Sequence, residues 1–138
     1  MADKKNFTID IHVRFRDLDA MGHVNNAVMF TYFEEGRTGF FLRHLRSESP
    51  SGFNFILAHI RCDYLLPLTL EDHPRLRLWI EEIGTKSIKI IYELSDQADG
   101  TRVFARGAST QVCYDYQARR SIEVSPALRS QLTPYLHP

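Results

Sequence analysis

The sequence has little cysteine, no excess charge of either sign and no long hydrophobic run. Its 138 residues include two cysteines, and 17 basic side chains balance 17 acidic ones. The balanced charge supplies no global positive field for nucleic acid. No apolar run approaches the roughly 18 residues that cross a bilayer as a helix. We therefore expect neither a nucleic-acid-binding protein nor a membrane span.

The scarcity of cysteine also limits metal and disulfide chemistry. Cys62 and Cys113 lie inside separate strand-like runs, and the sequence has no Cys-x-x-Cys pair and no histidine-rich tract. We expect two free, buried thiols, no metal site and no cofactor. The polar first ten residues lack the apolar core of a signal peptide, so a cytoplasmic location is expected. The length fits one domain, 1–138.

The apolar pattern predicts one strand, a long helix, four strands and a short helix. Period-two alternation predicts strands over 8–16, 53–66, 75–83, 86–94 and 101–116. Between the first two, apolar residues on most of the circumference predict a buried helix over about 26–46, with Asn25 or Asn26 as its N-cap. Ser125 and Pro126 begin a short terminal helix. Long strands with short links indicate an antiparallel sheet covered on one face by the long helix.

The alternation also predicts which side chains face inward. The first strand is expected to bury its odd-numbered residues from Ile9 to Phe15, and the second its even-numbered ones from Ile56 to Tyr64. Gly36 and Gly39 inside the helix would permit close backbone approach. One helix cannot cover both faces of five long strands, so a homo-oligomer is expected.

The densest polar cluster is the turn before the long helix, Asp-Leu-Asp-Ala-Met-Gly-His-Val-Asn-Asn over 17–26. A helix N-terminus presents unpaired N–H groups and a partial positive charge, and Gly22 lets the backbone approach a ligand. Such amides can polarise a carbonyl, and a nearby carboxylate can activate water or attack the carbonyl carbon. The same residue types also cap helices and form turns. The spacing alone therefore leaves catalysis and capping both open.

The segment "RFRDLDAMGHVNNAVMFTYFEEGRTGFF" over 14–41 resembles hotdog-fold thioesterases of the 4-hydroxybenzoyl-CoA thioesterase group and their acyl-CoA and acyl-ACP relatives. The resemblance extends over nearly the whole chain, through "EEIGTKSIKIIYEL" to the strand ending in "VCYD". It implies an α+β hotdog fold, in which an antiparallel five-stranded sheet wraps around one long central helix. Two copies would share one continuous sheet, as a homodimer or within a homotetramer. The implied reaction is hydrolysis of an acyl-CoA or acyl-ACP thioester to acid and thiol.

The resemblance also implies roles for residues of the turn. Asp19 matches the family's catalytic carboxylate, which acts as general base or as nucleophile. Asp17 matches the neighbouring aspartate that shapes the turn. The carbonyl- and substrate-binding positions of the family match Gly22, His23, Val24 and Asn25. An N-cap role accounts for Asn25 equally well.

Further positions are secondary candidates. Glu35 lies where other hotdog thioesterases carry a carboxylate, although a polar residue at a dimer seam is its plainer interpretation. Tyr32 is a candidate for the acyl pocket or simply for the core. Arg37 is placed to pair with Glu34, three residues before it. By resemblance, the phosphates of CoA would meet Lys86, Ser87, Arg61 and Arg106.

Two alternatives remain beside thioester hydrolysis. Hotdog hydratases and dehydratases carry a similar Asp and His, but the Asn-Pro segment of their motif does not follow Asp19 and His23 here. A non-catalytic acyl-CoA-binding protein would not need Asp19. The His-Val-Asn-Asn version of the motif resembles the aliphatic branches more than the aromatic enzyme. Chain length and the identity of the carrier are not readable from the sequence.

Overall fold

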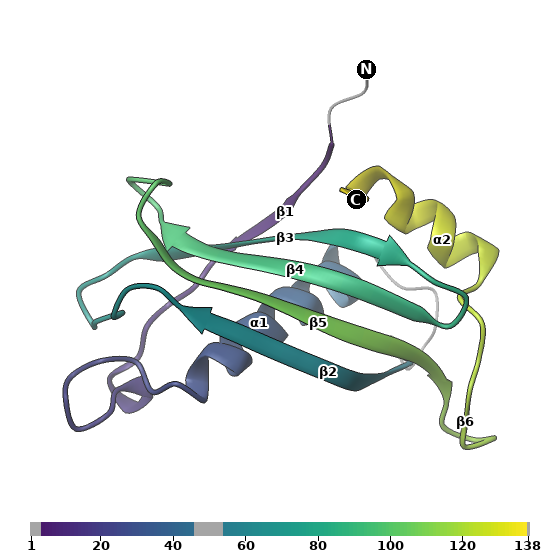
Figure 1. The fold of residues 1–138 in the computed structure, drawn as a ribbon, viewed down its shortest axis with the longest axis horizontal. Helices are drawn as coiled ribbons and strands as arrows, with labels where there is room; N and C mark the ends of the chain where they lie inside the picture. Colours follow the sequence, from purple (N-terminus) through teal and green to yellow (C-terminus); the bar gives the residue numbers. More distant parts are fainter. Residues whose placement is uncertain (1–3, 46–53, 138) are drawn as a thin grey trace.

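The computed structural model describes residues 4–45 and 54–137, and shows an antiparallel sheet curled around a long helix (Figure 1). The helices and strands are β1 (Phe7–Asp10), α1 (Val28–Thr38), β2 (Phe55–Tyr64), β3 (Pro74–Ile83), β4 (Ser87–Asp96), β5 (Val103–Asp115), β6 (Arg120–Ser121) and α2 (Pro126–Leu132). Short 3-10 turns occupy Phe15–Asp17 and Thr133–Tyr135. The strands neighbour one another in the order β1-β3-β4-β5-β2, and β6 pairs with β5. The predicted architecture is confirmed, and β6 is an element that the sequence pattern did not predict.

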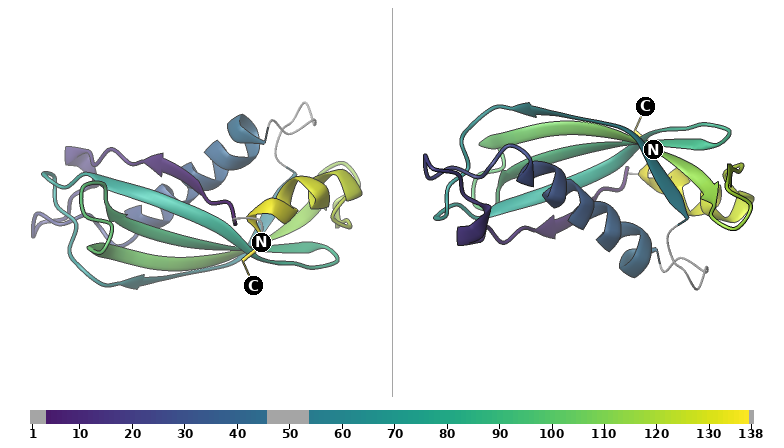
Figure 2. Two further views of the ribbon diagram at one scale, coloured as in Figure 1. Left: turned by 90° about the horizontal axis from the view of Figure 1, so that it is seen from above. Right: turned by 90° about the horizontal axis from the view of Figure 1, so that it is seen from below.

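The core lies between α1 and the concave face of the sheet. Figure 2 shows α1 running along that face, with α2 at one end of the sheet. Inward side chains alternate along each central strand, as a sheet with one covered face requires. Those at 1% exposure or less include Leu76, Leu78, Ile80, Ile88, Ile90, Tyr92, Leu94, Phe33 and Phe40. None of the described helices is long and apolar enough to cross a membrane.

Glycines permit close contact between α1 and the sheet. A Cβ on Gly36 would collide with the side chain of Leu76, and a Cβ on Gly107 of β5 would collide with the ring of Phe33. The Phe33 ring stacks on Tyr92 with centroids 4.5 Å apart. The prediction that Gly36 allows close approach is therefore confirmed. Beyond Thr38 the helix continues as a wider π-helical segment, Gly39–His44, and the predicted end at 46 lies outside the described residues.

The first strand is shorter than predicted. Ile11 and Val13 are buried, but pairing with β3 stops at Asp10, which lies opposite Arg75. The Ile11 N–H still donates to the Pro74 carbonyl at 3.0 Å, but Pro74 is the first residue of β3, so the chain has no partner in β3 beyond Ile11. Phe15 is 81% exposed in a 3-10 turn instead of facing inward. The prediction of a strand through residue 16 is wrong for this reason.

A β-bulge in β2 changes the predicted inward face. The register with β5 shifts between Leu57 and His59, so the alternation does not run through the strand. Ile60 and Cys62 are half-buried as predicted, whereas Ile56 is 37% exposed. A bulge adds one residue on one strand and reverses the faces on either side of it. The sequence pattern alone gave no sign of it.

The helix starts are partly as predicted. Ser125 caps α2, because its hydroxyl accepts a hydrogen bond of 3.1 Å from the Leu128 N–H. The residue directly before α1 is Ala27, and its side chain makes no cap. The Asn25 side chain instead accepts from the Ala27 N–H at 2.8 Å, and so closes the turn that leads into the helix. The Asn25 side chain thus stabilises the turn that leads into α1, and does not cap the helix itself as predicted.

Candidate active site

The Asp19 carboxylate organises the turn before α1. Its Oδ1 accepts hydrogen bonds from the Met21 N–H at 2.9 Å and from the His23 N–H at 3.1 Å. Asp19 N–H also donates to the His23 carbonyl at 2.7 Å, and Gly22, with φ of +79°, donates to the Asp19 carbonyl. Asp19 Oδ2 makes no hydrogen bond within the described residues. One oxygen therefore holds the loop, and the other remains available for chemistry.

The amides predicted to bind a carbonyl are already occupied. Gly22 and His23 N–H groups bond to Asp19, the Val24 N–H donates to Leu68 O at 2.7 Å, and the Asn25 N–H donates to Asp17 O at 2.8 Å. These hydrogen bonds correct the expectation that the amides of this stretch face a ligand. The next residue differs, because within 4–45 and 54–137 the Asn26 N–H has no acceptor.

A pocket of about 210 Å³ brings these groups together at the start of α1. It is lined by Asp19, His23, Val24, Asn26, Met29, Tyr64, Leu65, Leu66, Pro67 and Leu68. Tyr64, at the end of β2, donates from its hydroxyl to the Asn26 carbonyl at 2.7 Å. Asn26, Met29 and Tyr64 were not among the predicted site residues. Only the fold brings Tyr64 to a turn 38 positions away in sequence.

Asp17 anchors the turn to the helix. Its Oδ2 accepts from the Tyr32 hydroxyl at 2.7 Å and from the Arg14 N–H at 3.0 Å. Tyr32 is 2% exposed, and burial, followed by the hydrogen bond to Asp17, raises its pKa well above the usual range. Neither side chain lines the Asp19 pocket. Asp17 thus bonds within the turn and to α1, and its supporting role in catalysis stays a prediction.

Glu35 lies in a different groove. It lines a hollow of about 640 Å³ together with Arg14, Arg43 and His44, on the β1 side of α1. The structure therefore does not bring Glu35 to the Asp19 pocket. The predicted pair between Glu34 and Arg37 is confirmed, with 3.8 Å between the charged atoms.

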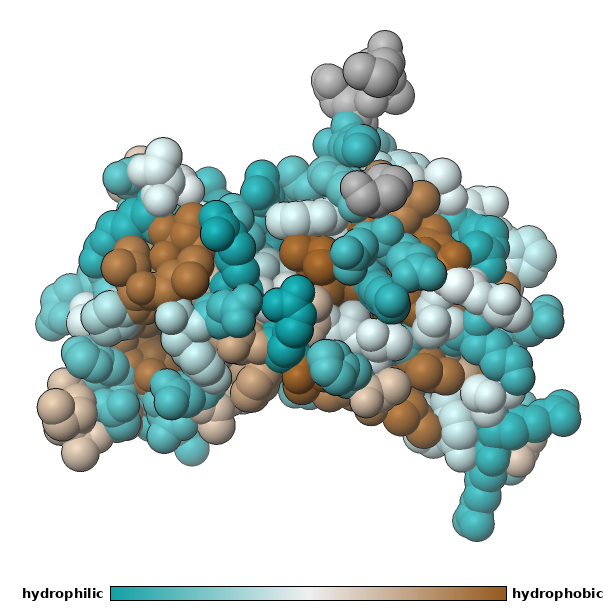
Figure 3. All heavy atoms as spheres, viewed as in Figure 1, coloured by the Kyte–Doolittle hydropathy of each residue, from teal (hydrophilic) through white to brown (hydrophobic). Residues whose placement is uncertain are grey.

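The predicted CoA-binding residues divide into two groups. Lys86 and Ser87 lie at the β3–β4 hairpin, beside the Cys113 end of β5, whereas Tyr64 of the Asp19 pocket pairs near the opposite end of β5. They are thus remote from Asp19 within one chain. Arg61 on β2 and Arg106 on β5 are exposed, and Figure 3 shows hydrophilic and hydrophobic residues mixed over the surface of the sheet. There they form ion pairs of 3.2 Å with Asp63 and 3.1 Å with Glu93 respectively.

The described cysteines are both free, as predicted. Cys113 is buried, but Cys62 is only half-buried on β2. Burial raises the pKa of Cys62 to about 11 and also raises that of Cys113. Neither thiol is therefore activated as a nucleophile, and neither lines the Asp19 pocket.

Comparison with known proteins supports a thioesterase relationship. FadM of Escherichia coli strain K12, a long-chain acyl-CoA thioesterase, is 26% identical over 124 residues, covering 88% of this chain and 93% of FadM. A thioesterase of Thermus thermophilus, solved with coenzyme A and Zn, is 29% identical with a TM-score of 0.78; the match covers 91% of this chain and 90% of that one.

A predicted thioesterase from Bacillus stearothermophilus has the same fold, with a TM-score of 0.86 at 24% identity over 96% of this chain and 98% of that one. The family model of the thioesterase-like superfamily matches residues 13–132. The narrower resemblance to the 4-hydroxybenzoyl-CoA group stays a prediction. With the curled sheet around α1, these matches show that the chain has the hotdog fold and belongs to the thioesterase-like superfamily.

Proposed function

We propose that this protein hydrolyses acyl-CoA thioesters and that Asp19 is its catalytic carboxylate. The observation that carries the proposal is the pocket at the start of α1, which is lined both by Asp19, whose Oδ2 accepts no hydrogen bond from the described residues, and by Asn26, whose N–H has no acceptor among them. Membership of the thioesterase-like superfamily fits that chemistry. CoA is favoured over ACP as the carrier because FadM is named for acyl-CoA and the Thermus relative was solved with CoA.

In the proposed mechanism the Asn26 N–H polarises the thioester carbonyl. The positive end of the α1 dipole adds to this field, and Tyr64 holds the next peptide, Asn26–Ala27, by its carbonyl. Oδ2 of Asp19 takes a proton from water as the water oxygen attacks the carbonyl carbon. The tetrahedral intermediate then expels the CoA thiolate, which receives that proton, and the acid is released.

The same geometry serves a nucleophilic route. Oδ2 of Asp19 would attack the carbonyl carbon, CoA would leave as the thiolate, and water would hydrolyse the mixed anhydride. A single turnover in ¹⁸O-water separates the routes, because the anhydride can place labelled oxygen on Asp19. His23 lines the same pocket and is proposed to contact the substrate by its side chain.

We further propose that two copies pair through β2. This ten-residue strand is the long edge of the sheet, and within the described residues it pairs only with β5. Ile56 and Leu57 on it are 37% and 44% exposed. A long, partly apolar free edge is a template for a second strand, so a homodimer with one continuous sheet is expected. Native mass spectrometry tests this assembly and any tetramer.

The test is thiol release from short, medium, long and aromatic acyl-CoAs by wild type and Asp19→Asn. An amide oxygen at residue 19 can still accept from the Met21 and His23 N–H groups, so the turn should keep its shape. We expect turnover to fall at least about 10³-fold with an unchanged melting temperature. Asp10→Asn, which alters a surface ion pair with Arg75 at the opposite edge of the sheet, is the matched control and should retain full activity.

Three outcomes would contradict the proposal. Asp19→Asn turnover close to wild type on every substrate would remove Asp19 from catalysis. Loss of crotonyl-CoA absorbance without thiol release would indicate a hydratase instead. Tight acyl-CoA binding with no turnover of any substrate would favour the non-catalytic binding protein.

A further inference from the structure

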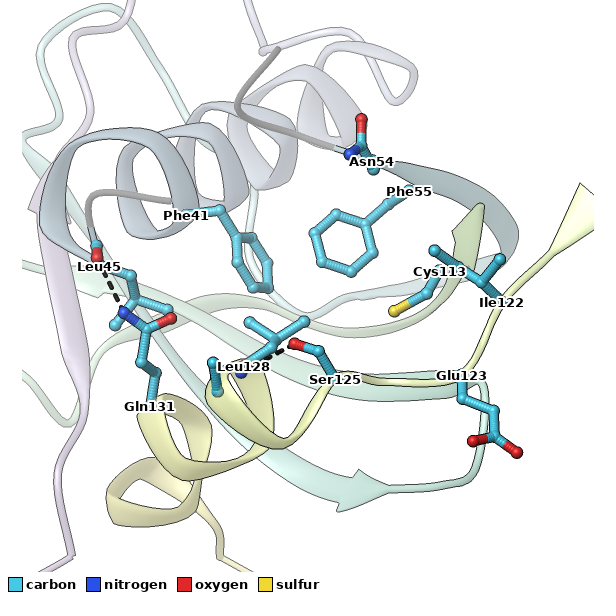
Figure 4. Close-up of a pocket in the computed structure, with 11 residues that line it drawn as sticks. Phe41, Leu45, Asn54, Phe55, Cys113, Ile122, Glu123, Ser125, Leu128 and Gln131 are labelled. Atoms are coloured by element: carbon cyan, nitrogen blue, oxygen red, sulfur yellow. Dashed lines mark hydrogen bonds between the residues drawn. The ribbon is translucent and has the colours of Figure 1, made fainter. Parts of the chain in front are cut away.

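A second, apolar cavity lies at the other end of the molecule from Asp19. It has a volume of about 200 Å³ and opens between the π-helical end of α1, the start of β2, the end of β5 and α2. Figure 4 shows the rings of Phe41 and Phe55 and the side chains of Cys113 and Leu128 turned toward one another around it. The two rings are 4.8 Å apart between centroids. The catalytic proposal above makes no use of this space.

Two of the polar side chains at the cavity are committed elsewhere. Ser125 caps α2 through its hydroxyl, and the Gln131 side-chain amide donates to the Leu45 carbonyl at 3.3 Å. The Glu123 carboxylate points away from the cavity (Figure 4). A charged or strongly hydrogen-bonding ligand would therefore lose its hydration without compensation. The lining suits an uncharged hydrocarbon group.

The volume limits the size of that group. An engineered cavity of about 150 Å³ lined by aliphatic and aromatic side chains binds benzene. A cavity of about 200 Å³ therefore holds a segment of roughly six to eight carbons. That size corresponds to the distal part of a medium or long acyl chain, not to a whole one.

Within one chain the cavity is remote from the Asp19 pocket. Phe55 at the cavity and Tyr64 at the Asp19 pocket are the two ends of β2. At about 3.3 Å per residue, nine steps along the strand separate them by roughly 30 Å. An acyl chain held at Asp19 would have to run the length of its own subunit to reach its own cavity.

Pairing of two copies through β2 brings the cavity of one copy to the Asp19 pocket of the other. When two identical strands pair antiparallel about a two-fold axis, the first residue of each lies near the last residue of its partner. Phe55 of one copy would then lie close to Tyr64 of the other, with about 5 Å between the strands. The exposed Leu65 and Leu66, at 47% and 40%, extend an apolar surface from the Asp19 pocket toward this junction.

We propose that the cavity lined by Phe41, Phe55, Cys113 and Leu128 binds the distal alkyl segment of an acyl chain whose thioester lies at Asp19 of the other subunit. The inference rests on the proposed function for the identity of the ligand. It adds a chain-length-sensing site that acts across the dimer. The occupant is the substrate's own hydrocarbon tail.

The first test fills the cavity. Cys113→Phe places a ring on the cavity wall. If this buried substitution prevents folding, Ala127→Trp narrows the cavity from α2 instead. We expect each variant to lower kcat/KM for palmitoyl-CoA at least tenfold and to leave butyryl-CoA within twofold. Ala118→Trp, at another exposed alanine that lies outside the cavity, should keep the wild-type chain-length profile. Equal loss on both substrates, or on neither, would overturn the assignment.

The second test asks which subunit supplies the cavity. A heterodimer of an Asp19→Asn chain and a Cys113→Phe chain, purified through two different tags, has one intact carboxylate and one intact cavity on opposite chains. If the cavity acts across the dimer, palmitoyl-CoA turnover should be about half that of wild type. If it acts within one chain, turnover should fall to about half that of the Cys113→Phe homodimer. A monomeric protein would also overturn the cross-subunit arrangement.

A binding measurement separates this inference from the proposed function. In a Cys62→Ser, Asp19→Asn protein, the alkylation of Cys113 by N-ethylmaleimide reports access to the cavity. Palmitoyl-CoA should slow it at least fivefold, and acetyl-CoA should not. An unprotected Cys113 would overturn the site even if hydrolysis is confirmed. Protection with no hydrolysis by the parent would support the site and contradict the enzyme.

Discussion

The Tyr32 hydroxyl donates a 2.7 Å hydrogen bond to Asp17 and so ties the buried face of α1 to the turn that carries Asp19. Asp17 also accepts from the Asn25 N–H through its carbonyl oxygen. The turn is thus held at two points, one on each side of the proposed catalytic residue. Tyr32 acts here as a positioning residue and does not touch the pocket.

Tyr32→Phe should separate positioning from catalysis. The variant removes one hydrogen bond, with an expected loss of about 1 kcal/mol in the free energy of unfolding, and it loosens the Asp19 loop. We expect kcat to fall by roughly three- to tenfold with KM little changed, since 1.4 kcal/mol corresponds to a factor of ten. The measurements are steady-state thiol release and urea unfolding.

The matched control is Tyr135→Phe. Tyr135 is 8% exposed and its hydroxyl makes a 2.6 Å hydrogen bond with His44, far from the Asp19 pocket. It should lose similar stability and keep wild-type kcat. If both variants lose kcat equally, the effect is general destabilisation and the positioning role fails.

Gly22→Ala tests the backbone of the turn. Gly22 has φ of +79°, and a Cβ there would meet no atom within 4 Å, so conformational strain is the cost of substitution. We expect a loss of about 1–2 kcal/mol in stability and a fall in kcat, because the Asp19 carbonyl and carboxylate both bond within this loop. Gly100→Ala also meets no atom within 4 Å and has no positive φ; it should cost nothing measurable. Equal melting temperatures for the two variants would contradict the strain argument.

The sequence predicted the architecture because hydrophobic periodicity is a local signal. The strands β3 and β4 alternate cleanly and were located within two residues at each end. The polar turn was also located correctly, directly before α1, whereas the distinction between Asp19 and Asp17 stays a prediction. These successes depend on neighbours in sequence, which a pattern can register.

The remaining features depend on contacts between distant segments. The end of β1 is set by where β3 begins, and the bulge in β2 is visible only in its register with β5. The occupied amides of Gly22 to Asn25 depend in part on the Leu68 carbonyl, 44 residues beyond Val24. The sequence could therefore indicate amides at the helix start as candidates for binding a carbonyl, but not which N–H lacks an acceptor.

Alkaline pH should weaken the fold through the buried thiols. Burial raises the pKa of Cys62 from 9.0 to about 11, so between these values the folded protein keeps a proton that the unfolded chain has lost. The unfolded state binds fewer protons, and stability falls as pH rises through this window. Below about pH 9 both states are protonated and the contribution is constant.

Cys62→Ala provides the measurement. The free energy of unfolding in urea, recorded from about pH 8 to 11, should decline less steeply for the variant than for wild type. Lys89→Ala, which removes an exposed ion pair with Glu82, should leave the slope unchanged below about pH 10, where lysine begins to titrate. Identical slopes for wild type and Cys62→Ala would show that this thiol does not cause the loss of stability at alkaline pH.

The buried Arg37 predicts an asymmetric pair of variants. Arg37 is 5% exposed and donates to the Tyr92 hydroxyl at 3.3 Å, while Glu34 lies 3.8 Å away on a side chain that is 69% exposed. The Tyr92 hydroxyl also bonds to Ser109 at 2.7 Å. Removing the arginine therefore leaves the Tyr92 hydroxyl with Ser109 as a partner. Removing the Tyr92 hydroxyl leaves the buried Arg37 cation with only its weak ion pair to Glu34.

Tyr92→Phe should therefore cost about 2–3 kcal/mol in the free energy of unfolding, and Arg37→Met less. The double variant should be more stable than the sum of the two losses by about 1 kcal/mol or more, because the buried charge and its acceptor leave together. Urea unfolding of all four proteins measures this coupling. Glu34→Gln should change stability by less than about 0.5 kcal/mol because that pair is largely exposed. Additive losses would show that the Arg37–Tyr92 hydrogen bond does not offset the burial of the Arg37 charge. In that case the exposed Glu34 or water stabilises the charge instead.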